Sequence, residues 1–272
     1  MTDEIEYEFG IAIPGRIKPQ TEWARTAIKH LPPPGPLDWN SIFGRSAPVV
    51  LELGCGNGRY TLMSAIQRPE LNHIGVDVLP AVIRYATRRA NQRGLHNVRF
   101  AVKDAETFMR LYVGASSLAE IHVYHPQPFH DARDKRRRLI TPRFLADVHR
   151  ALAPQGMFVV QTDSAAYWAY MKRVLPAFFE LHEQRGPWPD APEGRSRREI
   201  VAQQRGLPVF RAFGARRDLS AEAIAELLRA LPLPTFRSHR PPGPRTKQTG
   251  RRGDGETGRN SEAETRERGT GG

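Results

Sequence analysis

The stretch from Pro48 to Tyr60 constrains the fold of this chain more than any other. An apolar run of strand length leads into three glycines, Gly54, Gly56 and Gly58, and a helical pattern follows over residues 60–67. Glycine permits a tight backbone turn and lets a ligand approach where a Cβ atom would collide. A strand, a glycine turn and a helix in this order predict an open α/β sheet with a ligand site at its carboxyl edge.

Acidic residues recur at the ends of the first three predicted strands. Glu52 lies two residues before the first glycine; a second strand, residues 73–78, carries Asp77; and a third, residues 98–102, ends just before Asp104 and Ala105. A carboxylate at this edge is well placed to accept hydrogen bonds from a ribose diol. Dinucleotide-binding domains also have a glycine turn, but they prefer the spacing G-x-G-x-x-G.

The remaining pattern predicts a doubly wound, mostly parallel α/β sheet. Residues 81–93 have helical spacing, with Val82, Ile83, Tyr85 and Ala86 facing inward, several arginines facing outward and Gly94 as the cap. Further strands are expected at residues 121–124, 157–161 and 178–183, and further helices at 144–152, 167–175 and 221–231.

This pattern divides the chain into four parts. We expect an N-terminal extension over residues 1–45, a main domain over 46–217, a short helix within 218–231 and a disordered basic tail over 232–272. The extension carries basic residues and a proline-rich break at residues 32–36. It can lie over the domain or reach toward a partner.

Charge and cysteine content limit the classes of function. The chain has 41 basic and 29 acidic residues, a net charge of +12, which favours a polyanionic partner. Genomic base composition can account for part of this arginine excess. The single cysteine, Cys55, excludes an internal disulfide and a multi-cysteine metal site. His122, His125 and His130 form no regular ligand set, so we expect no metal.

The sequence also bears on location. The first eight residues are acidic and contain no apolar signal region, and no apolar run has the length needed to cross a bilayer. We therefore expect a cytoplasmic protein with no membrane partner, and we favour a monomer.

Over residues 45–217 the chain resembles the bacterial tRNA (guanine-N7)-methyltransferase family. The resemblance rests first on the run E-L-G-C-G-N-G at residues 52–58, on G-V-D at residues 75–77 and on Asp104-Ala105. It implies a Rossmann-like class I methyltransferase that uses S-adenosylmethionine. The residues implied to contact this cofactor are Glu52, Gly54, Gly56, Gly58, Asp77, Asp104 and Ala105.

A fourth block resembles the most specific motif of the family in altered form. The family has P-D-P-W followed by a basic run, whereas this chain has P-Q-P-F at residues 126–129 and then a basic run that ends at Arg138. Gln127 replaces the aspartate that the family places beside the methyl group and the guanine, so the resemblance implies a catalytic and cofactor-contacting role for it. Asp131 replaces a substrate-contacting lysine.

The resemblance extends to the residues that would bind the tRNA substrate. Asp163 matches the aspartate of a T-D pair, and residues 196–199 match T-x-[FY]-E without its aromatic residue. The implied substrate-binding residues are Asp131, Arg133, Arg136, Arg137, Asp163, Ser196 and Glu199.

Elementary chemistry accounts for these residue types. Guanine N7 has an in-plane lone pair, so methylation needs orientation rather than a base. The carboxylates of Asp163 and Glu199 can accept from the N1 and N2 donors of guanine. A carboxylate at position 127 would stabilise the positive purine that forms, and Gln127 contributes no such charge.

Structural roles compete with these functional ones. Asp163 can cap the next helix, Glu199 can pair with neighbouring arginines, and the run Arg136–Arg138 can be a solvated helix start instead of a phosphate contact. Three other functions also remain open. They are a methyltransferase paralogue with another nucleic-acid or small-molecule substrate, a non-catalytic RNA-binding module that keeps the cofactor pocket, and a nucleotide-dependent oxidoreductase.

Overall fold

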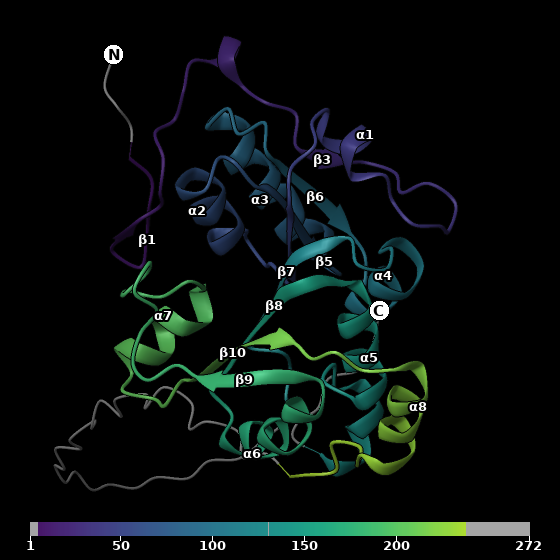
Figure 1. Ribbon diagram of the computed structural model, residues 1–272. Coiled ribbons are helices and arrows are strands. Elements are labelled where there is room, and N and C mark those ends of the chain that lie inside the picture. Colours follow the sequence, from purple (N-terminus) through teal and green to yellow (C-terminus); the bar gives the residue numbers. More distant parts are fainter. Residues whose placement is uncertain (1–4, 130, 238–272) are drawn as a thin grey trace, which may run out of the picture. The chain divides into compact units, whose positions relative to one another are not determined.

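An eight-stranded sheet with the order β3-β6-β5-β4-β7-β8-β10-β9 forms the centre of the protein (Figure 1). The computed structural model describes residues 5–129 and 131–237. The neighbouring strands from β3 to β8 run parallel, and β10 is antiparallel to both β8 and β9. The strands are β3 (Ala27–Ile28), β4 (Val49–Leu53), β5 (Asn72–Asp77), β6 (Val98–Val102), β7 (Leu118–Tyr124), β8 (Leu152–Thr162), β9 (Phe179–Glu183) and β10 (Phe210–Arg216).

Helices cover both faces of this sheet. Helices α2 and α3 pack against β5 and β6 on one face, whereas α5 and α6 pack against β8, with α4 and α8 against α5, on the other (Figure 1). A two-stranded hairpin of β1 (Tyr7–Glu8) and β2 (Ile11–Ala12) lies outside the sheet. The helices are α1 (Trp39–Phe43), α2 (Arg59–Gln67), α3 (Pro80–Gln92), α4 (Ala105–Tyr112), α5 (Pro142–Ala151), α6 (Ala165–Val174), α7 (Arg197–Gln204) and α8 (Ala221–Ala230), with 3₁₀ turns η1 (Gln20–Glu22), η2 (Ala132–Arg137) and η3 (Leu175–Ala177).

The alternation of side chains along the strands decides what reaches each face. In β4, Leu51 and Leu53 enter the larger apolar core together with Ile121 of β7. Because successive strand residues point to opposite faces, Glu52 points to the α2 face, where it contacts Thr61. The strand therefore buries leucines on one face and an acidic side chain on the other.

The predicted doubly wound, mostly parallel sheet is confirmed, and its central strands and helices lie close to their expected positions. The sequence patterns did not reveal β10, α4 or α7. Strand β10 contains arginines at positions 211 and 216, which obscure the apolar alternation. Helix α7 is highly charged, with few apolar residues to mark a buried face.

The expected outward position of the arginines on α3 is wrong for two of them. Arg89 and Arg93 are each 2% exposed, and both bind the carboxylate of Glu6, at 2.7 Å and 3.1 Å. Tyr85, expected to face inward, is 44% exposed. Ile83 and Ala86 are buried as expected.

The N-terminal extension lies over the main domain, which answers the question left open by the sequence. Strand β3 pairs with β6, and Glu8 accepts a hydrogen bond of 2.5 Å from the side chain of Asn57 in the glycine turn. Glu8 also lies within 3.9 Å of Arg59 and 3.7 Å of Arg89. The hairpin is thus joined to the turn by charged contacts.

The C-terminal end of the described chain is packed as well. The expected helix near residues 221–231 is confirmed as α8. A disordered tail was predicted from Pro232 onward. This is wrong for residues 232–237, because Pro234 is buried and the Phe236 ring packs at a tilt against Tyr167, with ring centroids 5.1 Å apart. The remainder of that predicted tail, residues 238–272, lies outside the described residues.

No helix within the part of the chain that the structure describes is both long and apolar enough to cross a membrane.

The packing of β5 against β6 leads to a stability prediction. A Cβ atom at Gly75 would lie 2.6 Å from the Phe100 ring and 3.0 Å from the sulfur of Cys55. We expect Gly75→Ala to lower the free energy of unfolding by about 1–3 kcal/mol because the core is overpacked. Urea unfolding measures this change. In the control Gly114→Ala, the nearest atom would be at an ordinary 3.5 Å, and equal losses in the two variants would contradict the prediction.

Candidate active site

The glycine turn after β4 is joined to β5 by backbone and side-chain hydrogen bonds. Gly54 and Cys55 donate to the carbonyl oxygen of Val76 at 2.8 Å and 3.0 Å, and Gly56 donates to Oδ2 of Asp77 at 2.9 Å. Each glycine of the turn has a φ angle that only glycine adopts readily, 76° at Gly54, 52° at Gly56 and 75° at Gly58.

The glycines of the turn differ in the space that surrounds them. A Cβ atom at Gly58 would lie 2.8 Å from the Cβ of Ala86, so this glycine allows α2 to pack closely against α3. A Cβ atom at Gly54 or Gly56 would meet no atom of the described residues within 4 Å. The turn therefore presents bare backbone on an open side, where a ligand can approach.

Glu52 is buried behind this turn with two hydrogen bonds from α2. It is 3% exposed, and its Oε2 accepts from the backbone N–H of Thr61 at 3.1 Å and from the hydroxyl of Thr61. Burial raises the pKa of Glu52 from 4.5 to about 8; Asp77 adds to this increase, whereas Thr61 and Arg195 oppose it. The folded protein therefore holds Glu52 protonated at neutral pH.

Asp77 ends β5, and Asp104 follows the end of β6 at the same edge. The register pairs Asp77 with Val102 of β6, which places Asp104 two residues beyond that level. Asp77 is half-buried, and its Oδ1 accepts from Leu79 N–H at 2.9 Å. Asp104 is exposed and caps α4, which begins at Ala105, by accepting from Thr107 N–H at 2.8 Å. The structure thus brings the three predicted acidic residues to one edge.

Two exposed apolar residues follow Asp77, and the sequence patterns did not indicate them. Val78 is 59% exposed and Leu79 is 56% exposed. A pair of large apolar residues just after a strand-ending aspartate is the signal that would have indicated an apolar wall at this edge.

Gln127 lies in the loop that follows β7. It is exposed, between the buried Pro126 and the half-buried Pro128. Two non-glycine residues of this loop have left-handed backbone angles, His125 with φ 51° and Phe129 with φ 39°. Such angles are strained for these residues and persist only where the surrounding structure holds them.

The predicted substrate-binding residues of the basic segment are exposed around η2. Asp131 caps this turn and binds the guanidinium of Arg133 at 2.7 Å; Arg133 lowers the pKa of Asp131 to about 2. Arg136 is exposed, and the guanidinium of the exposed Arg137 lies 4.4 Å from the centre of the Phe129 ring. These arginines remain candidates for phosphate contact.

Arg138, expected to extend this phosphate-binding run, is buried instead. It is 0% exposed, and its guanidinium donates to the carbonyl oxygens of Pro128 at 2.6 Å and Asp131 at 3.1 Å. A fully buried guanidinium that binds backbone carbonyls cannot reach a phosphate on a docked RNA. The proposed phosphate contact is wrong for this residue.

Asp163 follows β8, and its carboxylate contacts the side chains of Arg198 and His125. Its Oδ2 accepts from Nε and Nη2 of Arg198 at 2.8 Å and 2.7 Å, and its Oδ1 lies 3.3 Å from Nδ1 of His125. Burial opposes ionisation, but His125 and Arg198 together lower the pKa of Asp163 to about 2. The helix cap that follows is Ser164, so Asp163 is not itself the cap of α6.

Glu199 does not offer a free carboxylate to a base, contrary to the sequence-based expectation. It is 0% exposed and binds Arg211, also buried, through contacts of 2.6 Å and 2.9 Å. Its second oxygen accepts from Arg195 N–H at 2.8 Å. Ser196 caps α7 by accepting from Glu199 N–H at 3.1 Å. The arginine pairing considered for Glu199 is therefore correct, but it occurs in the interior.

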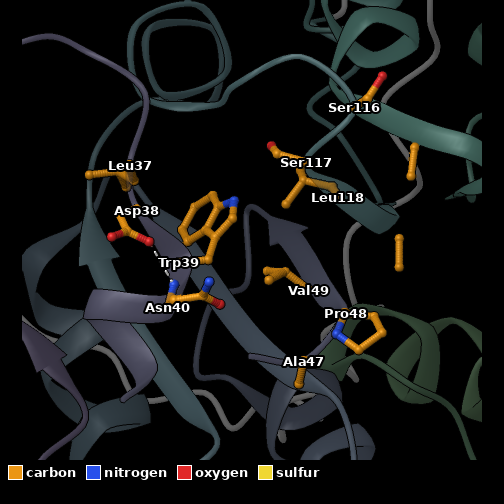
Figure 2. A pocket seen from close by; sticks show the side chains of 12 residues that line it. Leu37, Asp38, Trp39, Asn40, Ala47, Pro48, Val49, Ser116, Ser117 and Leu118 are labelled. Carbon is orange, nitrogen blue, oxygen red and sulfur yellow. Dashed lines mark hydrogen bonds between the residues drawn. The ribbon is translucent and has the colours of Figure 1, made fainter. Parts of the chain in front are cut away.

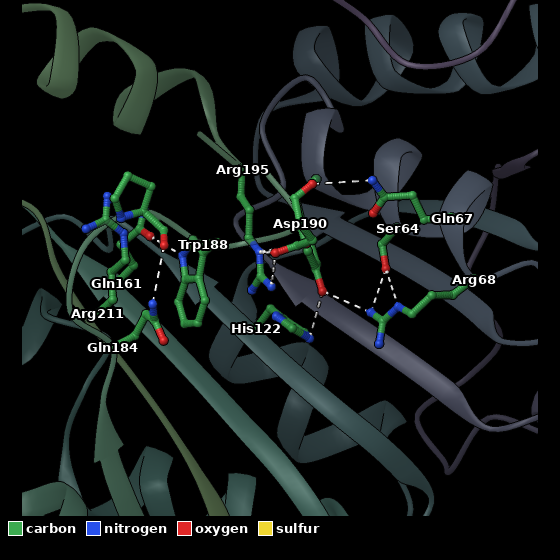
Figure 3. A network of polar contacts seen from close by, with 12 residues as sticks. Ser64, Gln67, Arg68, His122, Gln161, Gln184, Trp188, Asp190, Arg195 and Arg211 are labelled. Atoms are coloured by element: carbon green, nitrogen blue, oxygen red, sulfur yellow. Dashed lines mark hydrogen bonds and ion pairs between the residues drawn. The ribbon is translucent and has the colours of Figure 1, made fainter. Parts of the chain in front are cut away.

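A network of polar side chains supports the loop between β9 and α7 (Figure 3). Arg195 binds Asp190 at 2.7 Å, lies 4.1 Å from the centre of the Trp188 ring and donates to the hydroxyl of Tyr124 at 2.9 Å. Trp188 donates to Oε1 of Gln161 at 2.6 Å. Nothing in the sequence marks Arg195 as the centre of this network, because its partners come from separate elements.

The same network continues under helix α2. Glu120 binds Arg68 at 2.6 Å and His122 at 2.8 Å. Burial lowers the pKa of His122 from 6.5 to about 4, despite the opposing effect of Glu120. His122 is therefore neutral at physiological pH. Among the described residues, no group of three or more His, Cys, Asp or Glu side chains is placed to hold a metal ion.

A cavity of about 370 Å³ lies at the opposite end of the central strands (Figure 2). Trp39, Val49 and Leu118 are among the residues that line it. Val49 and Leu118 begin β4 and β7, whereas Glu52 and Gln127 lie toward or beyond the other ends of these strands. This cavity is therefore separate from the candidate site.

The strand order and the site define a methyltransferase of the Rossmann-like class. A dinucleotide-binding domain has the order 3-2-1-4-5-6, whereas here the antiparallel β10 is inserted between β8 and β9. The solved structure of the 16S rRNA methyltransferase KamB has a similar fold, with a TM-score of 0.54 at 17% identity over 71% of this chain and 99% of that one. A nucleotide-dependent oxidoreductase does not fit this topology.

Sequence comparisons identify the family. Residues 46–212 match the model of a family described as "Putative methyltransferase". The tRNA (guanine-N(7)-)-methyltransferase of Alkalilimnicola ehrlichii is 32% identical over 68% of this chain and 78% of that protein. The protein of the same name from Aeromonas hydrophila is 34% identical over 60% of this chain and 69% of that protein. The chain belongs to the tRNA (guanine-N7)-methyltransferase family.

The buried carboxyl of Glu52 leads to a pH prediction. Because its pKa is higher in the folded protein than in the unfolded chain, the stabilisation by protonated Glu52 is complete below pH 4.5 and is lost as the pH rises to about 8. We expect the unfolding free energy of the wild type, minus that of Glu52→Gln, to fall by about 1.4 kcal/mol per pH unit between these values. Urea unfolding at several pH values measures this slope. The control is Glu226→Gln at an exposed carboxylate, and a flat difference curve for Glu52→Gln would contradict the assigned pKa.

Proposed function

We propose that this protein transfers a methyl group from S-adenosylmethionine to N7 of a guanine in tRNA. The observation that carries the proposal is the convergence of Glu52, Asp77 and Asp104 around an open glycine turn, in a chain that belongs to the tRNA (guanine-N7)-methyltransferase family. The net charge of +12 supports a polyanionic substrate.

The residues of the edge fit this cofactor. The bare backbone at Gly54 and Gly56 leaves room for a ligand, and Asp77 and Asp104 are accessible carboxylates suited to hydroxyl and amino donors. Glu52 is a buried carboxyl that accepts hydrogen bonds from Thr61. An ammonium group of the ligand beside it would favour the ionised form of Glu52. When bound, S-adenosylmethionine supplies an electrophilic methyl group on a sulfonium sulfur.

The chemistry that remains for the protein is orientation and charge stabilisation. The N7 lone pair of guanine forms the bond to the methyl carbon, and the electrons of the broken carbon–sulfur bond remain on sulfur. No base is required, so the loop after β7 and the end of β8 contribute by fixing the purine. Gln127 is exposed at this position and can donate or accept a hydrogen bond.

Asp163 is the carboxylate best placed to bind the Watson–Crick edge of guanine. Both contacts from Arg198 go to Oδ2, and among the described residues Oδ1 has only the 3.3 Å contact with His125. Oδ1 can therefore accept from guanine while Arg198 keeps its pairing. Arg198 is exposed on its outer side, where it can also meet an RNA phosphate.

A non-catalytic RNA-binding module is the second candidate. It is favoured by Gln127 in place of the family's aspartate and by the internal pairing of Glu199 with Arg211. Such a protein would bind tRNA and S-adenosylmethionine without transferring the methyl group.

A transfer assay separates the two functions. We expect purified protein to transfer labelled methyl from S-adenosylmethionine to total tRNA and nucleoside mass spectrometry to identify 7-methylguanosine. Asp163→Asn should bind S-adenosylmethionine normally but methylate tRNA less efficiently, because the variant loses the charge facing the guanine donors. Normal binding of cofactor and tRNA with no labelled nucleoside would establish the binding module instead.

The position of Gln127 leads to a prediction of increased activity. We expect Gln127→Asp to raise kcat by about tenfold, because a carboxylate would stabilise the positive purine that forms. The affinity for S-adenosylmethionine, measured by calorimetry, should change less than kcat. A turnover equal to that of the wild type would show that charge at this position does not limit the reaction. Gln127→Ala, which removes the polar group, serves as the matched comparison.

A further inference from the structure

The loop that carries Gln127 is held by a buried arginine. The guanidinium of Arg138 donates to the carbonyl oxygens of Pro128, Phe129 and Asp131, so it binds the loop on the C-terminal side of Gln127. This loop contains the left-handed residues His125 and Phe129. Because such backbone angles require support from outside, the geometry of the loop depends on its contacts with Arg138.

The same guanidinium binds a segment from the other end of the described chain. Arg138 donates to the carbonyl oxygens of Pro234 and Phe236, the latter at 2.8 Å. Its Cζ lies 3.8 Å from the centre of the Phe236 ring, within the range of a cation–π interaction. We name residues 232–237 the C-terminal segment. One buried charge thus joins this segment to the Gln127 loop.

The C-terminal segment is in turn fixed on helix α6. The hydroxyl of Tyr170 donates to the carbonyl oxygen of Pro232 at 2.9 Å, and the Phe236 ring packs on Tyr167 and Tyr170 with centroid distances of 5.1 Å and 6.1 Å. Helix α6 begins two residues after Asp163. The segment therefore contacts both the loop that presents Gln127 and the helix that follows Asp163.

This connection comes from outside the part of the chain that matches the family. The family match ends at residue 212, whereas α8 and the C-terminal segment follow at residues 221–237. Helix α8 packs against α5, and the chain that follows it, the C-terminal segment, contacts α6 (Figure 1). Part of the support of the Gln127 loop thus comes from residues that follow the region matched by the family model.

We propose that the C-terminal segment positions the Gln127 loop for methyl transfer, with Phe236 and Arg138 as positioning residues. Phe236 covers the guanidinium of Arg138 and excludes water from its hydrogen bonds, and Arg138 fixes the carbonyl groups that follow Gln127. The proposed effect on methyl transfer rests on the proposed function, whereas the effect on the loop itself does not.

The test uses full-length Phe236→Ala. We expect faster hydrogen exchange in residues 126–137 and a kcat/KM for tRNA lower by about 100-fold, mainly through kcat, because the loop is misplaced. The affinity for S-adenosylmethionine should change far less than kcat, because Glu52 lies on β4, Asp77 ends β5 and Asp104 follows β6, all outside this loop. Phe236→Tyr keeps the ring and should restore both properties.

Leu233→Ala is the matched control in the same segment, because Leu233 is 45% exposed. Wild-type exchange in residues 126–137 of Phe236→Ala would overturn the proposal. Faster exchange throughout the protein with weaker cofactor binding would also overturn it, since Phe236 would then only stabilise the fold. If the wild type transfers no methyl group, the proposed function fails, but the exchange measurements still decide whether the segment holds the loop.

Discussion

The attachment of the glycine turn to β5 is the constraint on which the rest of the site depends. The N–H groups of Gly54 and Cys55 share one carbonyl oxygen of β5, and the N–H of Gly56 binds Asp77. The turn is thereby fixed relative to two strands at once. This fixed turn begins α2, and α2 in turn supplies the Thr61 groups that hold Glu52. A shift of the turn would therefore disturb the contacts of both Glu52 and Asp77.

Local patterns were sufficient to predict the centre of the fold and the acidic edge. Strands β4, β5 and β6 are apolar runs next to glycines or acidic residues, and this pattern depends only on neighbouring positions. The pairings that were missed are between distant residues. Arg89 binds Glu6 across 83 positions, and nothing near Arg89 indicates that its charge is buried. The exposure of Arg138 was mispredicted for the same reason, because its partners include residues nearly a hundred positions away.

Asp163 and Glu199 also show that the sequence does not predict which carboxylates are accessible to a ligand. Sequence resemblance placed Asp163 and Glu199 together as acceptors for a base, yet their environments differ. Glu199 is enclosed with Arg211, so its charge is neutralised within the fold, whereas within residues 5–129 and 131–237 one oxygen of Asp163 has a single weak contact. Two carboxylates predicted for the same role can therefore differ in whether a ligand can reach them, and the positions of the neighbouring arginines decide which one can bind a base.

The charged contacts of the hairpin make the N-terminal extension part of the folded unit. Without Glu6, the buried guanidinium of Arg93 would lose its carboxylate partner and that of Arg89 would keep Glu8 at 3.7 Å; breaking a buried pair costs about 3–5 kcal/mol. Without β3, the backbone of β6 would become an open sheet edge of the kind that pairs with other chains. A proteolytic cut that releases residues 1–45 would therefore leave a protein prone to edge-to-edge aggregation rather than a smaller working enzyme.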